Sequence, residues 1–462
     1  MSGTNDLTKG KVSLIILGFY FPLLATSMLQ QFYNFADTAI VGKGLGDNSL
    51  AAVGNMGSLC FLIVGFSMGL SNGFSILIAQ KFGEKNFPEL RKTLAASIKL
   101  AGIITVILTL LSCTFLRRIL LLLQTDKSIL SESLIYGYIL FGGLFATISY
   151  NMCSGILRSL GDSKTPLKAI VVSSILNISM DSIFIFVFHM GVESAAIATI
   201  FSQIVSAFIC LRKLKTIDFL KLTRNDFAPE PGRYGVLLKN GIPMALMNSI
   251  TAIGCMTVQY YVNGLGVAFT SAYSACSKYI NMFMTPACTS GYAMSAYTSQ
   301  NYGAKRFDRI REGLKVCLTI ALISYVILGS VMTLFPRMLA IVLLNGETQI
   351  SYAMQFLPVC GIMLFAVDML FVFRSGVQGM GFPLVPMISG ILEMVLRIGT
   401  ISLFIGTLGF RATAFAEVCA WIGALSLNAI AFAVIYARQS GHSLIRFRFT
   451  DYRRGYIEKR EG

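Results

Sequence analysis

The sequence predicts an all-α integral membrane protein with twelve transmembrane helices in two six-helix bundles, related by a pseudo-two-fold axis along the membrane normal. Three observations lead to this fold class: the composition, a series of long apolar segments and an internal repeat. Hydrophobic residues make up 55% of the 462 residues and charged residues only 13%, about half the charged share of a soluble domain. This composition excludes an ordinary cytosolic enzyme, because a soluble protein needs more polar surface.

Twelve apolar segments are long enough to cross a hydrocarbon core of about 30 Å, which takes about 20 helical residues. They are continuous, whereas the strands of a membrane β-barrel alternate polar and apolar residues. We expect the spans at 12–40, 51–79, 94–116, 131–155, 167–188, 194–211, 241–263, 269–298, 316–336, 350–373, 386–407 and 412–437.

The positions of Lys and Arg predict the orientation in the membrane. With the N-terminus inside, the terminal segments and the loops on that side hold 28 of these residues, the opposite loops six and the spans four. This asymmetry follows the positive-inside rule, so we expect a multi-pass protein of the cell (plasma) membrane with both termini cytoplasmic. The net charge of +16 is then explained by the Lys and Arg residues that fix the orientation in the membrane. We expect the lipid bilayer as a partner, no nucleic acid, and a functional monomer.

The second half of the chain repeats the first. Residues 80–85 (QKFGEK) resemble residues 300–305 (QNYGAK), and Pro22 corresponds to Pro243. Both halves contain an even number of spans and therefore have the same orientation. We expect an N-terminal six-helix bundle at 1–211, a basic cytoplasmic linker at 212–240, a C-terminal six-helix bundle at 241–437 and a basic cytoplasmic tail at 438–462.

A ridge of small residues, Gly65, Gly69 and Gly73, follows one face of the second span. Such ridges let helix backbones approach closely, and we expect this approach within the first bundle. No P-loop, G-x-S-x-G or HExxH motif occurs, so we expect neither an enzyme nor catalytic residues. A membrane-embedded enzyme stays as an alternative, because an intramembrane acid can also be catalytic.

Acidic residues within spans indicate function, because burying each one costs at least about 2.5 kcal/mol on insertion scales. Asp37 follows Pro22 by fifteen residues in span 1, where the proline allows bending. Asn177 and Asp181 share one face of span 5, and Thr199 on span 6 adds a hydroxyl. Carboxylate and amide oxygens suit a hard cation such as sodium, held by Asp37, Asn177 and Asp181, or a proton. The alternatives are an interfacial helix end for Asp37 and a polar helix–helix contact for span 5.

The second half contains further candidates. Asp368 is either a second acid or a partner of Lys278 or Arg374, and the spacing of Glu393 and Arg397 predicts a structural ion pair within one helix. Aromatic and methionine side chains predict an adaptable cavity for flat cations, with ordinary packing as the alternative. These residues are Tyr33, Met180, Tyr260, Tyr273 and Met282.

Several motifs resemble those of the multidrug and toxic compound extrusion (MATE) family. They are QFYNFADTAIVG at 31–42 with LAAVG at 50–54, LRSLGDSKTP at 157–166, and QNYGA at 300–304. The family consists of antiporters that expel organic cations in exchange for sodium or protons. The resemblance implies a cation site at Asp37, Asn177, Asp181 and Thr199, a bending proline at Pro22, and an acid used by some members at Asp368.

The chain departs from the family pattern on span 7. Many members carry a glutamate a few residues after the proline that corresponds to Pro243, whereas residues 247–251 (MNSIT) contain no acid. We therefore expect the cation site in the N-terminal half.

Together these observations predict a secondary active transporter that expels organic cations or drugs by alternating access. The coupling ion is sodium or a proton, and no cofactor is expected. The alternative is a flippase for a lipid-linked headgroup, which needs inward basic residues. Its candidates are Lys99, Lys278, Arg374 and Arg397.

Overall fold

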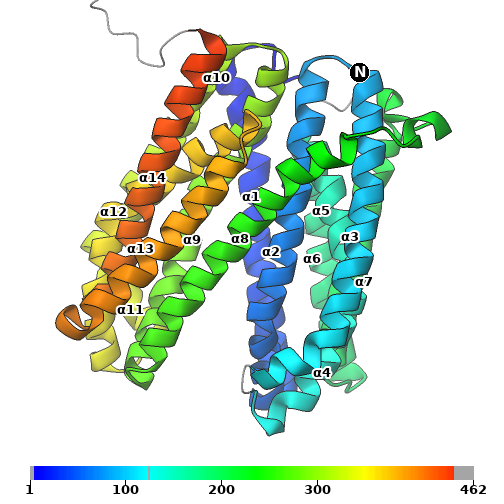
Figure 1. The fold of residues 1–462 in the computed structure, drawn as a ribbon. Coiled ribbons are helices and arrows are strands. Elements are labelled where there is room, and N and C mark those ends of the chain that lie inside the picture. Colours follow the sequence, from blue (N-terminus) through cyan, green and yellow to red (C-terminus); the bar gives the residue numbers. More distant parts are fainter. Residues whose placement is uncertain (1–4, 123–124, 442–462) are drawn as a thin grey trace, which may run out of the picture.

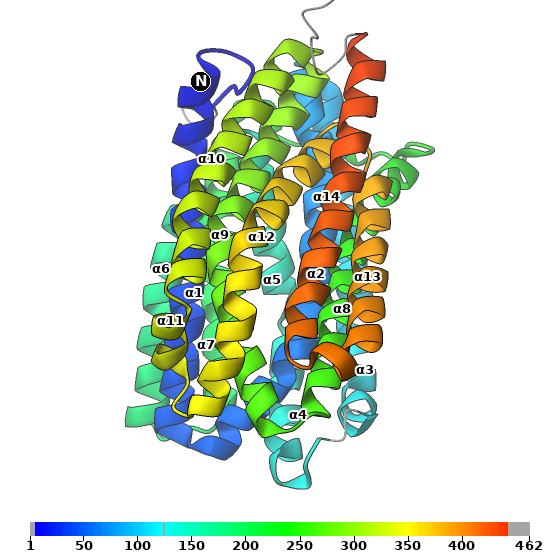
Figure 2. The ribbon, with the colours of Figure 1, turned by 90° about the vertical axis from the view of Figure 1, so that its left-hand side faces the viewer.

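The computed structural model describes residues 5–122 and 125–441, and the helices form two bundles side by side (Figure 1, Figure 2). The first half contains α1 (Val12–Leu45), α2 (Asp47–Gly83), α3 (Phe87–Leu122), α4 (Lys127–Gly142), α5 (Leu144–Ser159), α6 (Lys164–Ser182), the π-helical η1 (Ile183–Val187) and α7 (Glu193–Lys215). Two short 3₁₀ turns follow, η2 (Asp218–Leu220) and η3 (Arg224–Phe227). The second half contains α8 (Arg233–Asn263), α9 (Val267–Gly303), α10 (Phe307–Leu334), α11 (Pro336–Leu343), α12 (Glu347–Gly379), α13 (Leu384–Leu408) and α14 (Arg411–Ser440).

The helices provide the predicted spans. In the described ranges, ten helices are long and apolar enough to cross a membrane, and α4 with α5, bent by 46°, forms an eleventh. α9, whose 37 residues include many Ser, Thr and Tyr, is less apolar and lies where the span at 269–298 was predicted. Several of these polar side chains are buried inside the protein, so they do not face the lipid. The prediction of an all-α fold with twelve spans in two bundles is confirmed.

The backbone repeats with the sequence. Ten of the eleven residues with positive φ in the described chain form five pairs, four of them separated by 220 positions and one by 222. The pairs are Gly10 with Gly232, Gly46 with Gly266, Lys85 with Lys305, Gly161 with Gly381, and His189 with Gly409. The turns between spans therefore have the same conformation in both halves, which the pseudo-two-fold relation requires.

The first helix of each half packs against helices of both halves. α1 packs on α6 in its own half and on α9 across the interface, while α8 packs on α13 and on α2. The glycine ridge of α2 lies at this crossing: a Cβ on Gly69 would lie 2.5 Å from the Met244 carbonyl oxygen, and one on Gly73 would lie 2.6 Å from the Gly241 Cα. The ridge thus brings the two halves together, and the prediction that it acts within one bundle is wrong.

The two halves also meet where α2 and α9 end, in a contact that obeys the pseudo-symmetry. The Gln80 side chain donates to the Gly379 carbonyl at 3.0 Å, and the Gln300 side chain donates to the Ser159 carbonyl at 2.7 Å. Gly83 and Gly303 lie against the backbone of Gln300 and Gln80, respectively, where a Cβ on either glycine has no room. We call this arrangement, formed by Gln80, Gly83, Gln300 and Gly303 with the two carbonyls, the helix-end contact.

The segment before α1 reinforces the helix-end contact. The Leu7 amide donates to the Gln300 side chain at 2.9 Å, and Arg309 donates to the carbonyls of Leu7 and Gly10 at 3.3 and 2.9 Å. Asp6 pairs with Lys85 of the first half at 2.8 Å. The chain therefore bridges both halves before α1 begins.

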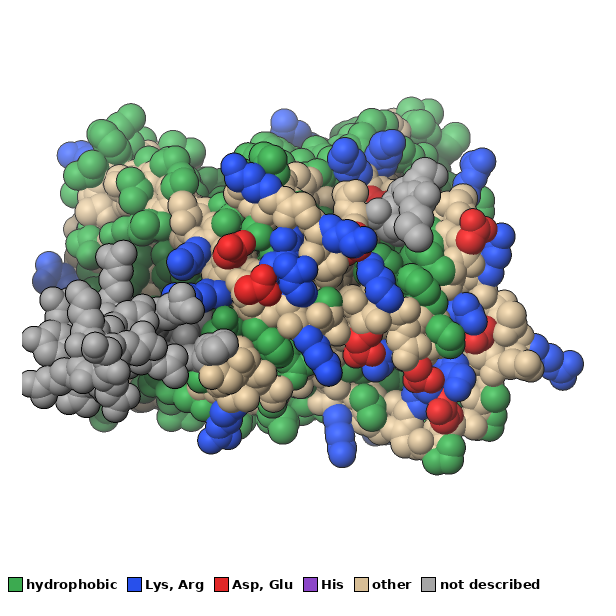
Figure 3. Space-filling view, turned by 90° about the horizontal axis from the view of Figure 1, so that it is seen from above, with side chains coloured by type: hydrophobic (Ala, Val, Ile, Leu, Met, Phe, Trp, Pro, Cys, Tyr) green, Lys and Arg blue, Asp and Glu red, His purple; other side chains and the backbone are tan. Residues whose placement is uncertain are grey.

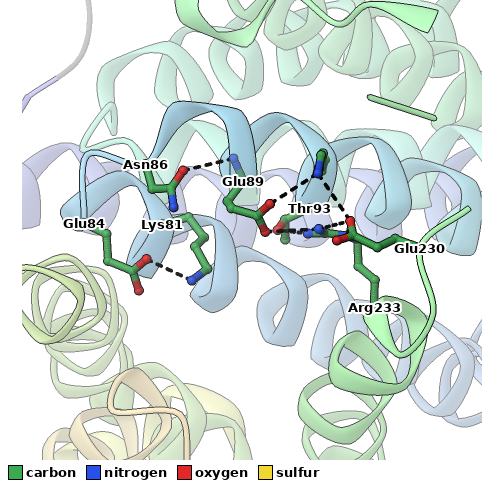
Figure 4. Close-up of polar contacts among 8 residues, drawn as sticks. Lys81, Glu84, Asn86, Glu89, Thr93, Glu230 and Arg233 are labelled. Atoms are coloured by element: carbon green, nitrogen blue, oxygen red, sulfur yellow. Dashed lines mark hydrogen bonds and ion pairs between the residues drawn. The ribbon is translucent and has the colours of Figure 1, made fainter. Parts of the chain in front are cut away.

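The connection between the halves is fixed to α3. Arg233 forms ion pairs with Glu89 of α3 and with Glu230, and it donates to the Thr93 hydroxyl at 3.2 Å (Figure 4). Lys99 donates to the carbonyl of Phe227 at 2.6 Å, so Lys99 lies at this end of the bundle and is no candidate for binding a headgroup in a cavity. The limits of the linker at 212–240 and of the two bundles stay predictions.

The loops that join the helices at this end carry many charges. Lys and Arg side chains are spread over the face in Figure 3, with fewer Asp and Glu side chains between them. Burial opposes the charge of Asp226, but hydrogen bonds from Thr223 and the neighbouring Arg91 guanidinium outweigh it and hold the pKa of Asp226 below its ordinary value. Fixed charge pairs thus anchor the connection on the basic end of the molecule.

Candidate functional site

Two carboxyl groups from different helices meet inside the first half. Asp37 lies on α1 and Asp181 on α6, and their side chains are within hydrogen-bonding reach of each other. Asp181 is fully buried, and Asp37 Oδ1 and both Asp181 oxygens have no hydrogen-bond partner in the described chain. Ionised carboxylates only accept hydrogen bonds, so this pair needs a proton or a cation between its oxygens.

The electrostatic cost of leaving the pair empty and doubly ionised is substantial. Two unit charges 4 Å apart repel by about 4 kcal/mol at an effective dielectric constant of 20. In the described residues neither carboxylate forms an ion pair with Lys or Arg. The occupancy of the pair by a proton or cation therefore changes the stability of the α1–α6 packing.

Asn177 adds neutral oxygen to this site. It lies one turn before Asp181 on α6, is fully buried, and neither its amide oxygen nor its amide nitrogen has a partner in the described chain. Asp37, Asn177 and Asp181 thus offer carboxylate and amide oxygens, which suit a hard cation. No group of three or more His, Cys, Asp or Glu side chains that could hold a metal ion occurs among the described residues.

Hydroxyl groups surround the acid pair. Tyr33, one turn before Asp37, lies beside Thr199 of α7 and close to both carboxylates. Tyr136 of α4 also lies close to both. Tyr136 was not predicted from the sequence, because a single tyrosine in an apolar span carries no signal of its partner. Four helices therefore contribute to the site.

The helices on either side of the acid pair can change shape. Pro22 lies inside α1 and has no amide hydrogen to donate to the Gly18 carbonyl, and the Thr26 hydroxyl donates to the Pro22 carbonyl at 2.8 Å. On α6, the π-helical segment Ile183–Val187 begins two residues after Asp181, and such segments interrupt regular α-helical hydrogen bonding. A change at the acid pair can therefore be relieved by repacking of both helices.

A second feature is a cavity of about 530 Å³ on the other side of α2. Its wall comes from α2, α8, α9, α12, α13 and α14 and includes four charged side chains: Arg374, Glu393, Arg397 and Glu417. A cavity of this size suits a drug-sized ligand. The wall does not include Asp37 or Asp181, so the cavity and the acid pair are separate.

The charged side chains of the cavity form two interhelical ion pairs. Arg374 of α12 pairs with Glu393 of α13, and Arg397 of α13 pairs with Glu417 of α14 at 2.8 Å. The predicted pair of Glu393 with Arg397 is therefore wrong, because each residue has a closer partner on a neighbouring helix.

Asp368 lies apart from both sites. It is fully buried on α12, and neither of its oxygens has a partner in the described chain. Tyr20 of α1 lies near it. The predicted alternative of an ion pair with Lys278 or Arg374 is wrong, since Arg374 pairs with Glu393 and the exposed Lys278 forms no ion pair with Asp368.

Comparison with known proteins gives the family. A model of the MatE family matches residues 22–183 and 243–402, more than half of the chain. The chain belongs to the MATE family.

Relatives of this MATE protein match it over most of their length. A Bacillus subtilis (strain 168) protein described as "Probable multidrug resistance protein YoeA" is 29% identical over 75% of this chain and 76% of its own length. "Probable multidrug resistance protein NorM" of Thermotoga maritima is 25% identical over 83% of this chain and 84% of its own. The crystal structure of a MATE protein in complex with MaL6 has a TM-score of 0.89 at 22% identity and covers 96% of this chain and 100% of that chain.

Family membership makes this MATE protein a multi-pass membrane transporter.

The residues predicted to line a cavity lie in different parts of the structure. Tyr273 lies in the cavity wall. Tyr33 of α1 lies near the acid pair, and the half-buried Met180 directly precedes Asp181 on α6. Tyr260 and Met282, which are 76% and 46% exposed, do not belong to the wall.

Proposed function

We propose that this MATE protein exports small organic molecules, organic cations among them, from the cytoplasm across the cell membrane in exchange for sodium or protons. One observation carries the proposal: the half-buried Asp37 and the fully buried Asp181 are close together and have no basic partner in the described chain. Relatives described as multidrug resistance proteins support the direction of transport and the class of substrate.

The acid pair couples ion binding to the packing of the first half. A sodium ion held by Asp37, Asn177 and Asp181, or a proton shared by the two carboxylates, removes their repulsion. α1 then repacks around Pro22 and α6 around its π-helical segment, with Tyr33 and Thr199 moving with the site. This is a population shift, which requires the ion to favour one packing over the other.

The helix-end contact is the element that closes the transporter on one side of the membrane. We assign the end with this contact and the basic loops to the cytoplasm, in keeping with the positive-inside rule. The structure then corresponds to a state whose cytoplasmic side is closed by Gln80 and Gln300. Alternating access requires the two hydrogen bonds to break together when the cavity opens inwards.

The driving force is modest. A tenfold gradient of a monovalent ion supplies about 1.4 kcal/mol, and each net charge moved supplies about 2.3 kcal/mol more per 100 mV. One-for-one exchange of monovalent cations moves no net charge, so only the ion gradient then drives export.

The lipid-linked flippase is the second candidate, and one observation bears on it. Arg374 and Arg397 lie in the cavity wall, as a phosphate group would require, but each is paired with a glutamate. The wall therefore has no net positive charge for a phosphate, and small-molecule export is the better proposal.

Proteoliposomes test the proposal. Purified protein is reconstituted, and accumulation of a fluorescent organic compound is followed under a sodium gradient and, separately, under a pH gradient. We expect one of the gradients to drive accumulation and the other to have no effect. Accumulation that is equal with and without both gradients would refute coupled export.

A further inference from the structure

A small cavity lies between the two halves, next to the helix-end contact. It has a volume of about 50 Å³, and its wall comes from α2 and α5 of the first half and from α8, α9 and α12 of the second. Ser159, whose carbonyl accepts from Gln300, belongs to this wall, while Asn72 and Tyr292 belong both to it and to the large cavity. We call it the floor cavity, because it lies where the large cavity ends at the helix-end contact. It is too small for a drug-sized compound but has room for a small ion and its water.

Arg158 is the only charged side chain among the described residues of this wall. It forms no ion pair and donates no side-chain hydrogen bond within the described chain. The acid nearest to it in the sequence, Asp162, instead accepts from backbone amides at the start of α6 at 3.0 Å. The groups close to the guanidinium, Tyr150, Cys210 and Tyr292, are uncharged at neutral pH. Arg158 is therefore a positive charge between two membrane-spanning bundles without a counter-charge, which is unfavourable.

The guanidinium of Arg158 can be reached from the floor cavity. The side chain is only half-buried and lines this cavity, in contrast to the enclosed Arg374 and Arg397. A Cβ on Gly155 would lie 2.5 Å from Ser75 Oγ and 3.9 Å from Arg158 Nη2, so the guanidinium lies beside α2, where the two halves meet. Its charge is therefore available to a ligand in this space.

Neutral hydrogen-bond donors from both halves lie in the same wall. The Asn72 side chain of α2 and the Ser295 hydroxyl of α9 line the floor cavity, are half-buried, and form no hydrogen bond within the described chain. The hydroxyls of Ser75 and Ser299, by contrast, already donate to carbonyls of their own helices. A guanidinium with an amide and a hydroxyl offers N–H and O–H donors around a single positive charge, which suits a small anion.

We propose that the floor cavity binds a chloride ion, held by Arg158 and Asn72 from the first half and by Ser295 from the second. Because the cavity is formed where the halves meet, the anion binds the arrangement closed by the helix-end contact and leaves when the halves separate. Chloride therefore stabilises the closed arrangement. The inference concerns neither the substrate nor the coupling ion, and it rests on the proposed function only for the assignment of the helix-end contact as the closing element.

Hydrogen exchange tests the inference on the purified full-length protein in nanodiscs of neutral lipid. Potassium chloride replaces potassium gluconate at constant ionic strength, with no sodium, no substrate and no gradient. A ligand that binds one arrangement alone multiplies the population of that arrangement by 1 + [L]/Kd, which is about tenfold for about 100 mM chloride and a Kd of about 10 mM. We expect peptides covering 80–87 and 300–307 to exchange about tenfold more slowly in chloride. Equal exchange in the two salts would overturn the inference.

Substitutions assign the effect to the floor cavity. Arg158→Gln removes the charge and should abolish the protection by chloride. The matched control Arg212→Gln should keep the protection, because Arg212 is exposed on α7 and does not line the cavity. Ser295→Ala removes one hydroxyl from the opposite half and should raise the chloride concentration for half-maximal protection about fivefold. Protection that is unchanged in either Arg158→Gln or Ser295→Ala would contradict the site.

The same measurement separates the chloride site from the helix-end contact. Gly303→Ala weakens the contact itself. Exchange that is faster in this variant but indifferent to chloride would refute the chloride site and leave the contact as the closing element. Exchange that chloride slows equally in all peptides of the protein would show a general salt effect and would also refute the site.

Discussion

Gly303→Ala tests the helix-end contact. A Cβ on Gly303 would lie 2.8 Å from the Gln80 carbonyl carbon, whereas carbon atoms in contact lie about 3.5–4.0 Å apart. The ends of α2 and α9 must therefore separate by about 1 Å. The hydrogen bonds from Gln80 and Gln300, now 3.0 and 2.7 Å long, would then exceed the normal range.

The free-energy cost of opening the helix-end contact follows from the loss of these two hydrogen bonds. Leaving a buried hydrogen-bonding group unsatisfied costs about 1–3 kcal/mol, so losing both bonds costs about 2–6 kcal/mol. Since 1.4 kcal/mol is a factor of ten in an equilibrium, the closed arrangement should lose at least about tenfold in population. Gly83→Ala should behave in the same way, because the repeat places Gly83 against the Gln300 backbone.

Hydrogen exchange measured by mass spectrometry checks this expectation. Peptides covering 80–87 and 300–307 should exchange at least about tenfold faster in Gly303→Ala, and transport should slow. Gly102→Ala is the matched control, because a Cβ at this exposed helix position meets no atom within 4 Å. Unchanged exchange in both Gly303→Ala and Gly83→Ala would refute the assignment of the contact as a closing element.

Two further substitutions test helix packing, one at an ion pair inside the second half and one at the contact between the two halves. Glu417→Gln leaves the buried Arg397 without a counter-charge and should lower the unfolding free energy by about 3–5 kcal/mol. Glu347→Gln, in an exposed pair, should cost no more than about 1 kcal/mol; equal thermal shifts for the two variants would contradict this view. Gly69→Ala places a Cβ 2.5 Å from the Met244 carbonyl oxygen and should destabilise the protein by about 1–3 kcal/mol, measured by thermal unfolding in detergent. An unchanged midpoint would show that α2 and α8 pack less closely than described.

The sequence predicted features that depend on composition and local spacing. Apolar length and the asymmetry of Lys and Arg are properties of each segment, and the repeat appears as the matched positive φ angles of Lys85 and Lys305. The predicted spans were shorter than the helices, because helices continue beyond the hydrocarbon core as polar turns, as α2 does up to Gly83.

Features that depend on the register between helices could not be predicted. Glu393 and Arg397 have ideal spacing for a pair on one helix, yet Arg374 and Glu417 from neighbouring helices are their partners. The glycine ridge of α2 indicated close approach but not which helix approaches, and α8 lies there. Tyr136 joins the acid pair only because α4 packs beside it.

The central claim is that the occupancy of the Asp37–Asp181 pair drives transport, and ion-driven transport by Asp37→Asn and Asp181→Asn in proteoliposomes tests it most directly. Asp218→Asn, which changes an exposed acid paired with Lys221, is the matched control. We predict that both acid-pair variants insert and fold like the wild type but lose gradient-driven accumulation, while the control keeps it. Full accumulation in either acid-pair variant would contradict the account.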